Sequence, residues 1–554
     1  MTALSQNAFF LDADGRALSA TCFLPDSVRG AVLFVPPFCE ERKGTLPVFV
    51  QAARALGEMK IASLLFDFSG CGDSEGAFGD TPPACFEADC EAAWRWLVQA
   101  FPTAPRGLAG IRTGAVLAAR LAARQPGAAA LVLWAPVTGT DFVRQLLQRR
   151  MVNDMVAYGK ARESRASLEA RLSRGESIDL DGYTVSGAFY AWLQGLAPQP
   201  AEAPALVCPG GHDEKTAAAC MPQHAGTSPL PLRFPPFWNT VGHVDLSALV
   251  AETATWLSGR FADAPPAEGS GNPAFRAAVP WGELAALGTT ATIRAIFDTP
   301  PQAPQAGVLF LHGWSGDRTG PHRLFARFSR ALAQRGHLCL RPDFTGRGLS
   351  DGGADDASIA RMAENAQTAL DALRRRLPPG APVAVVAICS GCKVALTLAA
   401  RNQDLAKLLL WSPESMGALR NAATGLRKTW GTLATYARKL TRPETWKKIL
   451  SGKVQTGMVT KALVKQEMRS PEEAAWEDGV LRAFRTYRNP IQFVFGGSDP
   501  DAAGSREAYT RYCRAYGIPH DVHTIAHAGH SFYGEAWTRE LLDVSHAFLD
   551  GPRD

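Results

Sequence analysis

The sequence repeats itself once, and this repetition limits the folds that the chain can adopt. Five short motifs of the first half recur in the same order in the second half, and in three pairs the copies lie 276 or 277 positions apart. The pairs are Val32–Phe38 with Val308–Trp314, Asp67–Ser74 with Asp343–Ser350, Gly110–Gly114 with Ala387–Gly391, Gly210–Asp213 with Gly496–Asp499, and Gly242–His243 with Gly529–His530. Chance does not keep five motifs in one order at nearly one spacing, so we expect two copies of one domain fold.

The junction between the copies can be placed from composition. Residues 263–280 are rich in Pro, Gly and Ala and show no apolar periodicity, which is typical of a linker. We therefore predict one domain over residues 1–262 and a second over residues 281–554. Between the third and fourth motifs each half has a long segment with helical periodicity, residues 137–198 and 413–486. We expect each of these segments to form a lid over the strand ends.

Each half alternates short apolar runs with segments of helical periodicity. The runs 30–35, 62–66, 383–387 and 492–495 end near Gly, Pro or Asp, and helical patterns cover residues 324–336 and 360–377. This alternation predicts an α/β fold with a mostly parallel sheet and helices on both faces. The repeated motifs follow the predicted strands, so their residues are expected to meet at the carboxyl edge of each sheet.

The second half carries a pattern typical of nucleophilic catalysis. Cys389 lies between the strand 383–387 and a helix that begins near Gly391, which is the strand–turn–helix context of a nucleophile elbow. Asp499 and His530 follow in the chain order nucleophile, acid, histidine that α/β-hydrolases show. We predict that Cys389 attacks a carbonyl carbon, that His530 transfers the proton and that Asp499 orients the imidazole.

Two backbone N–H groups are expected to form the oxyanion hole of this site, those of Trp314 and Ser390. Other assignments remain open from the sequence. Ser390 could be the nucleophile, Asp501 the acid or His527 the base. The pair Cys389 and Cys392 forms a C-x-x-C motif at a helix start and could be redox-active.

The first half departs from this catalytic pattern. Its elbow position is Arg112, which stays protonated and cannot act as a nucleophile. Asp213 and His243 are retained, so we predict a degenerate site in a catalytically inactive domain. Phe38 stands at the oxyanion position, and Glu40 and Glu41 follow it. We expect a buried ion pair of Arg112 with these glutamates in place of the catalytic geometry.

Composition excludes several classes of protein. With 46% hydrophobic and 20% charged residues the chain is neither disordered nor fibrous, and no apolar run is long enough for a transmembrane helix. The net charge of +5 gives no reason to expect nucleic-acid binding. The odd number of cysteines, 11, favours reduced thiols, and the sequence shows no secretory signal, so we expect a cytoplasmic protein without cofactor or metal.

The motifs resemble those of a known superfamily. Asp343–Ser350 together with Ile388–Gly391 are similar to α/β-hydrolases of the serine-aminopeptidase and lipase type. A closer resemblance is to exosortase A system-associated hydrolases. The second half resembles type 1 members through its Cys elbow and residues 438–454, and the first half resembles type 2 members through residues 37–41, 70–74, 175–183 and 235–240. The resemblance implies two tandem α/β-hydrolase domains, a bacterial origin and a link to exopolysaccharide production or protein sorting.

Positive charge is concentrated in one segment of the second half. Residues 413–469 contain 12 Lys and Arg but 3 Asp and Glu, with Trp430, Tyr436 and Trp446 among them. This segment is either a solvated helical face or a docking surface for an anionic carrier, a lipid surface or a polysaccharide.

The sequence therefore favours a hydrolase or acyltransferase that acts on a small-molecule ester or thioester through Cys389. Cleavage of a peptide or carbon–carbon bond by the same triad is a further possibility. The alternative from another class is a non-catalytic interaction protein of a polysaccharide or protein-sorting assembly. Reactivity of Cys389 distinguishes the two, because only a nucleophile needs an activated thiol.

Overall fold

The computed structural model describes the chain except for residues 1–3, 200, 212–217, 219–226, 241–243, 266, 269–274, 289–291, 420–470 and 552–554. The described residues form two compact units. The first contains Met1–Phe310, Ser315–Ala381 and Tyr533–Leu542, and the second contains Leu311–Trp314, Pro382–Phe532 and Asp543–Asp554. The boundaries of these units differ from the sequence repeat, because early elements of the second half pack within the first unit.

The first half is built on an eight-stranded sheet. Its strands, in spatial order, are β1 (Leu4–Ala13), β2 (Arg16–Pro25), β5 (Ile61–Phe66), β4 (Gly30–Val35), β6 (Arg106–Ile111), β7 (Ala128–Trp134), β10 (Ala205–Cys208) and β11 (Thr227–Pro229). The pairs from β5 to β11 are parallel, whereas β1, β2 and β5 pair antiparallel. The sheet is therefore mostly parallel with an antiparallel edge.

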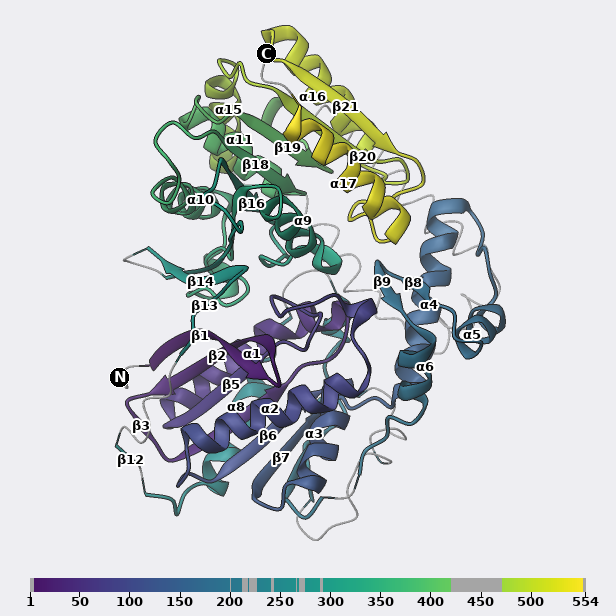
Figure 1. Cartoon of the computed structure of the whole chain (residues 1–554), viewed down its shortest axis with the longest axis vertical. Helices are drawn as coiled ribbons and strands as arrows, with labels where there is room; N and C mark the ends of the chain where they lie inside the picture. Colours follow the sequence, from purple (N-terminus) through teal and green to yellow (C-terminus); the bar gives the residue numbers. More distant parts are fainter. Residues whose placement is uncertain are drawn as a thin grey trace. The chain divides into compact units, whose positions relative to one another are not determined.

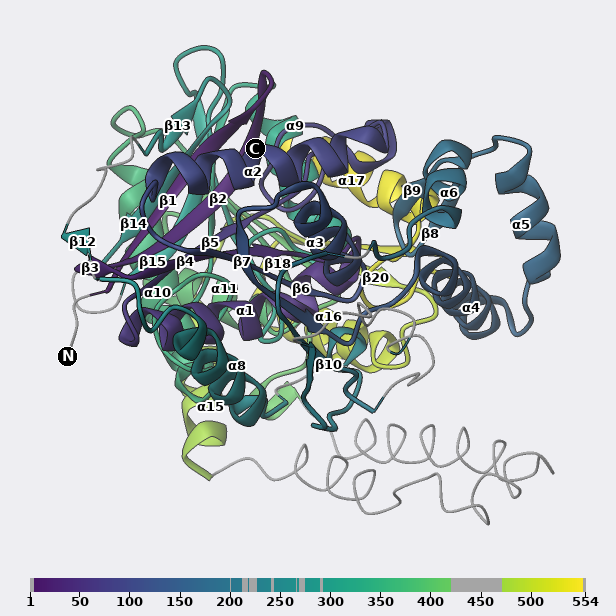
Figure 2. The ribbon, with the colours of Figure 1, turned by 90° about the horizontal axis from the view of Figure 1, so that it is seen from below.

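Helices cover both faces of this sheet, as Figures 1 and 2 show. The covering helices are α1 (Glu40–Glu58), α2 (Ala84–Ala100), α3 (Thr113–Arg124) and α8 (Ser247–Arg260). Along β4 the side chains alternate between two cores: Leu33 and Val35 pack with α2 and α3, whereas Val32 and Phe34 pack with α1 and α8. Burial on both faces explains why this strand reads as a continuous apolar run.

An insertion follows β7 in the first half. It consists of α4 (Gly139–Tyr158), α5 (Arg165–Ser173), the antiparallel pair β8 (Ile178–Leu180) and β9 (Tyr183–Val185), and α6 (Gly187–Gln194). The sequence indicated helices for residues 137–198 but gave no sign of the short hairpin. Each of the three helices begins with a side-chain cap, from Thr138, Ser164 and Ser186.

The second half contains a sheet with the same strand order. Its strands, in spatial order, are β13 (Ala278–Val279), β14 (Gly282–Leu287), β15 (Ile293–Asp298), β17 (His337–Pro342), β16 (Ala306–Leu311), β18 (Val383–Ile388), β19 (Lys407–Trp411), β20 (Ile491–Gly496) and β21 (His520–Ile525). From β14 onward the order repeats that of the first sheet strand for strand. The fold is thus two tandem α/β domains, as the repeated motifs predict.

The helices of the second half follow its strands. They are α9 (Leu324–Ala333), α10 (Ile359–Arg374), α11 (Gly391–Arg401), α15 (Pro471–Phe484), α16 (Ala502–Tyr516) and α17 (Glu535–Asp550). Of the segment 413–486, the central residues 420–470 lie outside the described residues, and with them the aromatic positions 430, 436 and 446. The linker region 263–280 contributes β13 and the short strand β12 (Ala267–Glu268), which pairs with β3 (Ser27–Val28). Within the described residues, no helix is both long enough and apolar enough to span a membrane.

A buried network of ion pairs within the first unit follows the sequence repeat. Arg42 and Arg318 lie 276 positions apart, and each binds the aspartate that opens the second motif of its own half. Arg42 Nε lies 2.6 Å from Asp67 Oδ1, and Arg318 Nη1 lies 2.7 Å from Asp343 Oδ2. The two halves have therefore kept the same internal ion pair.

Each of these arginines also binds an aspartate of the other half. Arg42 Nη1 lies 2.7 Å from Asp317 Oδ2, and Arg318 Nε lies 2.6 Å from Asp73 Oδ2. Arg341 adds a further contact, with Nη1 2.7 Å from Asp73 Oδ1. The two crossed contacts are not equivalent, because the counterpart of Asp317 is Glu41 and the counterpart of Asp73 is Leu349.

Candidate active site

The sharp turn between β18 and α11 places Cys389 at the carboxyl edge of the second sheet. Cys389 has a positive φ of 59°, which is a strained backbone conformation for a residue other than glycine. Gly391 makes the turn possible, because a Cβ at this position would lie 2.3 Å from the carbonyl oxygen of Leu311. The turn therefore has the geometry of a nucleophile elbow.

The loops after β20 and β21 bring an acid and a histidine together. His530 Nδ1 lies 2.8 Å from Asp499 Oδ2, and Asp499 Oδ1 accepts a hydrogen bond from the backbone N–H of Asp501 at 3.0 Å. The imidazole is also within hydrogen-bonding reach of the Cys389 sulfur. The three residues that the sequence singled out thus lie in one chain of contacts within the second unit.

The protonation of His530 follows from these contacts. Burial acts to lower the pKa of His530, but the hydrogen bonds with Asp499 and Cys389 and the charges of these groups outweigh it and raise the pKa to about 11. These contacts therefore favour the imidazolium form while the sulfur is a thiolate. With Nδ1 bound to Asp499, Nε2 is the nitrogen left to exchange a proton with the sulfur.

The expected oxyanion loop has a partner that the sequence did not indicate. The backbone N–H of Trp314 donates to Ser390 Oγ at 2.7 Å, so this donor is already engaged. The Ser390 hydroxyl thereby joins the oxyanion loop to the start of α11. The Trp314 N–H therefore points at Ser390 in this structure, and its predicted role in an oxyanion hole stays a prediction.

A carboxylate that sequence reasoning missed contacts the thiol of Cys389. Glu414, which lies three residues after the end of β19, accepts a hydrogen bond from Cys389 Sγ at 3.3 Å. Lys393 of α11 holds this carboxylate, with Nζ 3.1 Å from Glu414 Oε2, and also lies 3.5 Å from Glu477 Oε1. The signal that could have found Glu414 is its position directly after a strand of the catalytic sheet.

The elbow of the first half holds an arginine in the same strained conformation. Arg112 has φ 57° and ψ −124°, and its side chain is buried. Its Nε lies 3.1 Å from Glu41 Oε2, its Nη2 donates to Gln145, and its guanidinium lies 4.3 Å from the ring centroid of Trp238. The guanidinium is thus fully engaged where the second half has a thiol.

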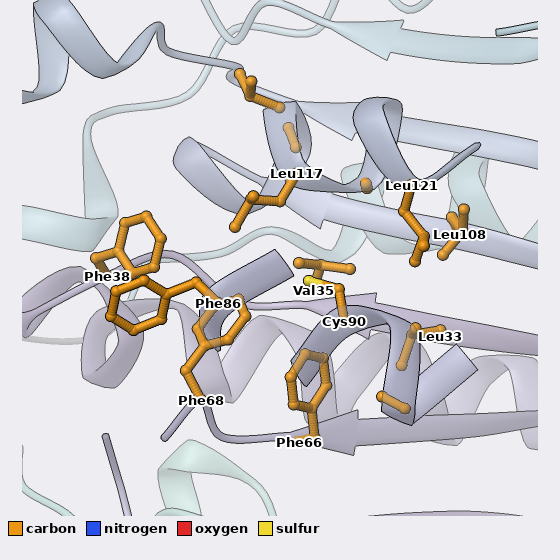
Figure 3. Packing of buried hydrophobic residues seen from close by; sticks show 14 of the residues in the cluster. Leu33, Val35, Phe38, Phe66, Phe68, Phe86, Cys90, Leu108, Leu117 and Leu121 are labelled. Carbon is orange, nitrogen blue, oxygen red and sulfur yellow. The ribbon is translucent and has the colours of Figure 1, made fainter. Parts of the chain in front are cut away.

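The oxyanion position also differs between the halves. Trp314 is 38% exposed, whereas Phe38, its counterpart 276 positions earlier, is fully buried. The Phe38 ring lies 5.3 Å from that of Phe68 and 4.9 Å from that of Phe86 (Figure 3). Its backbone N–H donates to Thr113 Oγ1 at 3.3 Å, which parallels the bond between Trp314 and Ser390. Aromatic packing therefore replaces an open oxyanion loop in the first half.

Glu40 does not join Arg112, contrary to our expectation that both glutamates would reach it. Its carboxylate instead binds Lys43, the Tyr183 and Tyr533 hydroxyls at 3.1 and 2.9 Å, and the His322 backbone N–H at 3.0 Å. The reason is geometric, because consecutive residues at a helix start point in different directions. The predicted positions 213 and 243 lie outside the described residues.

The family comparisons agree with this geometry. Residues 308–544 match the family described as the alpha/beta hydrolase family, and residues 26–170 match the family described as serine aminopeptidase, S33. The chain carries two α/β-hydrolase domains in tandem. No curated protein matches this sequence significantly.

Three similar solved structures each correspond to about half of this chain. The alpha/beta hydrolase domain-containing protein 10 from mouse is 17% identical over 48% of this chain and 98% of its own, with a TM-score of 0.33. An esterase from Pyrococcus furiosus is 16% identical over 49% of this chain and 91% of its own, with a TM-score of 0.35. A dienelactone hydrolase from Anabaena variabilis is 13% identical over 49% of this chain and 98% of its own, with a TM-score of 0.33.

The alternative candidates from the sequence, Cys392, Asp501 and His527, lie in different environments from those of the three residues above. Cys392 is buried, its Sγ donates to the carbonyl oxygen of Trp411 at 3.5 Å, and burial raises its pKa well above the usual value for a thiol. Asp501 begins α16 and orients Asp499 through its backbone N–H. His527 has a positive φ of 61° in the loop after β21. Within the described part of the chain no group of three or more His, Cys, Asp or Glu side chains is arranged to hold a metal ion.

Proposed function

We propose that the second domain of the tandem hydrolase cleaves ester or thioester substrates with Cys389 as the nucleophile. The observation that carries this proposal is the contact chain from Asp499 through His530 to a cysteine at a strained elbow. A thiolate at a helix start beside an imidazolium is a strong nucleophile at neutral pH. The α/β-hydrolase domains supply the fold in which this order of residues performs acyl chemistry.

The first half-reaction transfers the acyl group to the enzyme. The Cys389 thiolate attacks the carbonyl carbon, a C–S bond forms, and the carbonyl electron pair moves to oxygen. Collapse of this tetrahedral intermediate breaks the bond to the leaving group, which takes the proton from His530 Nε2. The backbone N–H of Ser390 is the predicted donor that stabilises the negative oxygen, and the N–H of Trp314 joins it once it leaves Ser390 Oγ.

The second half-reaction restores the enzyme. Water attacks the thioester carbonyl while His530 takes its proton, and collapse expels the Cys389 thiolate and releases the carboxylic acid. Asp499 stabilises the imidazolium in both steps and fixes its Nδ1 tautomer. An alcohol or amine in place of water gives acyl transfer through the same steps.

The first domain of the tandem hydrolase serves a structural role in this proposal. Its elbow holds Arg112 in an ion pair with Glu41, and Phe38 fills the space beside its oxyanion loop with aromatic packing. Neither arrangement offers a nucleophile. The resemblance to exosortase A system-associated hydrolases supports a bacterial, cytoplasmic role linked to exopolysaccharide or protein sorting, with the basic segment 413–469 as the face for an anionic partner.

The test measures the thiol and the reaction separately. Iodoacetamide labelling of the full chain between about pH 5 and 9, with peptide mapping, is expected to modify Cys389 before the other ten cysteines, at a pH below the midpoint of about 8.5 of a free thiol. Cys389→Ala is expected to abolish turnover of p-nitrophenyl esters and acyl thioesters, whereas Cys392→Ala retains it. Labelling of Cys389 no faster than the other cysteines, together with activity in Cys389→Ala, would contradict the proposal.

A further inference from the structure

Two groups compete for the proton of the Cys389 sulfur. The Glu414 carboxylate accepts a hydrogen bond from Sγ at 3.3 Å, and because an ionised carboxylate can only accept, this bond exists only while the sulfur is protonated. His530 in its imidazolium form can only donate, and its bond to Sγ is strongest when the sulfur is a thiolate. The two contacts therefore stabilise opposite protonation states of the same atom.

Two further contacts hold Glu414 in the position from which its carboxylate accepts the hydrogen bond of the thiol. Its Oε2 lies 3.1 Å from Lys393 Nζ, and its backbone carbonyl accepts a hydrogen bond from the Tyr509 hydroxyl at 2.7 Å. Lys393 is almost fully buried, and its second contact is Glu477 at 3.5 Å. Two carboxylates thus share one ammonium, and Glu414 is the one that reaches the sulfur.

The carboxylate of Glu414 is ionised at neutral pH and open to substrate. Burial acts to raise its pKa, but the Lys393 ammonium and the hydrogen bonds from Lys393 and Cys389 outweigh burial, so the pKa lies below its usual value. The side chain is 40% exposed, in contrast to Lys393 at 1%. A substrate in the site can therefore approach the contact between Glu414 and Cys389.

The first half lacks both members of this pair. Trp411-Ser412-Pro413-Glu414 corresponds to Trp134-Ala135-Pro136-Val137 at a spacing of 277 positions, and Lys393 corresponds to Val116 at the same spacing. The half with Arg112 at its elbow has neither the carboxylate nor the ammonium. A purely structural ion pair would have no reason to follow the nucleophile.

We propose that Glu414 is a positioning residue that raises the share of protonated Cys389 thiol between turnovers and releases the sulfur to His530 when substrate enters. The proposal rests on the proposed role of Cys389 as the nucleophile. Substrate that displaces the Glu414 contact leaves Sγ free to pass its proton to Nε2 of the neutral imidazole of His530, so the thiolate and the imidazolium form together next to the carbonyl carbon. Glu414 thereby lowers the resting fraction of the thiolate, the form that alkylation and oxidation require.

The groups that face the sulfur define the expected pH behaviour. Lys393 and Cys392 belong to α11, and Glu414 belongs to the loop after β19. His530 belongs to the loop after β21 and is hydrogen-bonded to Asp499, which follows β20. Removing the charge of Glu414 leaves the imidazolium and the ammonium in place. The balance then moves toward the thiolate.

The experiment measures iodoacetamide alkylation of Cys389 against pH in the full chain, without substrate. We expect Glu414→Gln to move the midpoint of the rate profile to lower pH by about one unit, so that alkylation near pH 6 becomes up to about tenfold faster. His530→Ala is expected to move the midpoint to higher pH. Glu477→Gln neutralises the other carboxylate on Lys393 without touching the sulfur and is the matched control. Glu414→Asp, which keeps the charge, is expected to shift the midpoint less than Glu414→Gln.

The four variants separate this proposal from the function on which it rests. A shift in His530→Ala without one in Glu414→Gln overturns the role of Glu414 and leaves the catalytic proposal standing. A shift in Glu414→Gln without one in His530→Ala supports the contact with Glu414 and overturns the triad. Equal shifts in Glu414→Gln and Glu477→Gln would also overturn the proposal, because they would assign the effect to Lys393.

Discussion

At the scale of single residues, the tautomer of His530 decides whether the site can work. Asp499 accepts from Nδ1 at 2.8 Å, which leaves Nε2 for the sulfur. Asn at position 499 offers an amide donor as well as an acceptor and permits the wrong tautomer. We expect Asp499→Asn to lower kcat on a p-nitrophenyl ester by roughly 10²–10⁴-fold, as loss of the acid does in serine triads.

Asp501→Asn is the comparison for this prediction, since the Asp501 side chain is the other acid in the same loop. Asp501 contacts Asp499 through its backbone N–H, which the substitution retains. We expect kcat of Asp501→Asn to stay within about twofold of the wild type. A larger loss in Asp501→Asn than in Asp499→Asn would reverse the assignment of the acid.

The buried ion pair of Arg112 and Glu41 leads to a prediction for the free energy of unfolding. Glu41→Ala leaves the guanidinium of Arg112 buried with Gln145 and Trp238 but without a carboxylate. Breaking such a pair from one side costs about 3–5 kcal/mol. Chemical denaturation followed by tryptophan fluorescence should show this loss, and Arg112→Met in the same background should recover part of it. Unchanged stability of Glu41→Ala would show that the pair contributes nothing.

At the scale of elements, the junction of β16, β18 and α11 sets the elbow. A Cβ on Gly391 would lie 2.3 and 2.6 Å from the carbonyl oxygens of Leu311 and His312, and backbone atoms cannot yield as a flexible side chain can. We expect Gly391→Ala to lower stability by about 1–3 kcal/mol and to lower kcat, because the oxyanion loop must move. Gly479→Ala in α15, whose Cβ would meet no atom closer than 3.7 Å, is the control and should be neutral or stabilising. Equal effects of both substitutions would exclude the steric explanation.

Part of the fold and of the candidate site could be predicted from the sequence. The predicted run 30–35 is β4, the periodic segment 324–336 contains α9, and the periodic segment 360–377 overlaps α10, because burial on two faces and helical spacing leave strong patterns. Cys389, Asp499 and His530 could be found because motifs at strand ends converge on one edge. The position of Glu414 shortly after a strand of the same sheet was a signal for that residue, but no local pattern records its contact with Lys393 on the buried face of a helix. Glu40 and Glu41 are adjacent in sequence, and only packing decides which of them binds Arg112.

At the scale of the whole molecule, duplication explains the buried network of the first unit. Arg42 and Arg318 keep the aspartate of their own half and exchange a second aspartate with the other half. The pairs within each half repeat, but the crossed contacts are not copies of each other, because the counterparts of Asp317 and Asp73 are Glu41 and Leu349. In a single chain the two copies are free to diverge, and Arg341 at Asp73 is one such asymmetric addition.

The pKa of Asp73 provides a pH-dependent test of how much this network stabilises the fold. Burial acts to raise the pKa of Asp73, but Arg341 and Arg318 outweigh it and hold the pKa far below its usual value. A carboxyl whose pKa is lowered on folding stabilises the protein above its unfolded pKa of about 3.9 and loses that contribution as the pH falls through the native pKa. We therefore expect Asp73→Asn to be less stable than the wild type by about 3–5 kcal/mol at pH 7, with the difference shrinking below about pH 4. Thermal unfolding from pH 7 down to pH 2 measures this, with the exposed Asp80→Asn as control. A difference that stays constant over this range would mean that Asp73 acts through packing and that its charge does not hold the halves together.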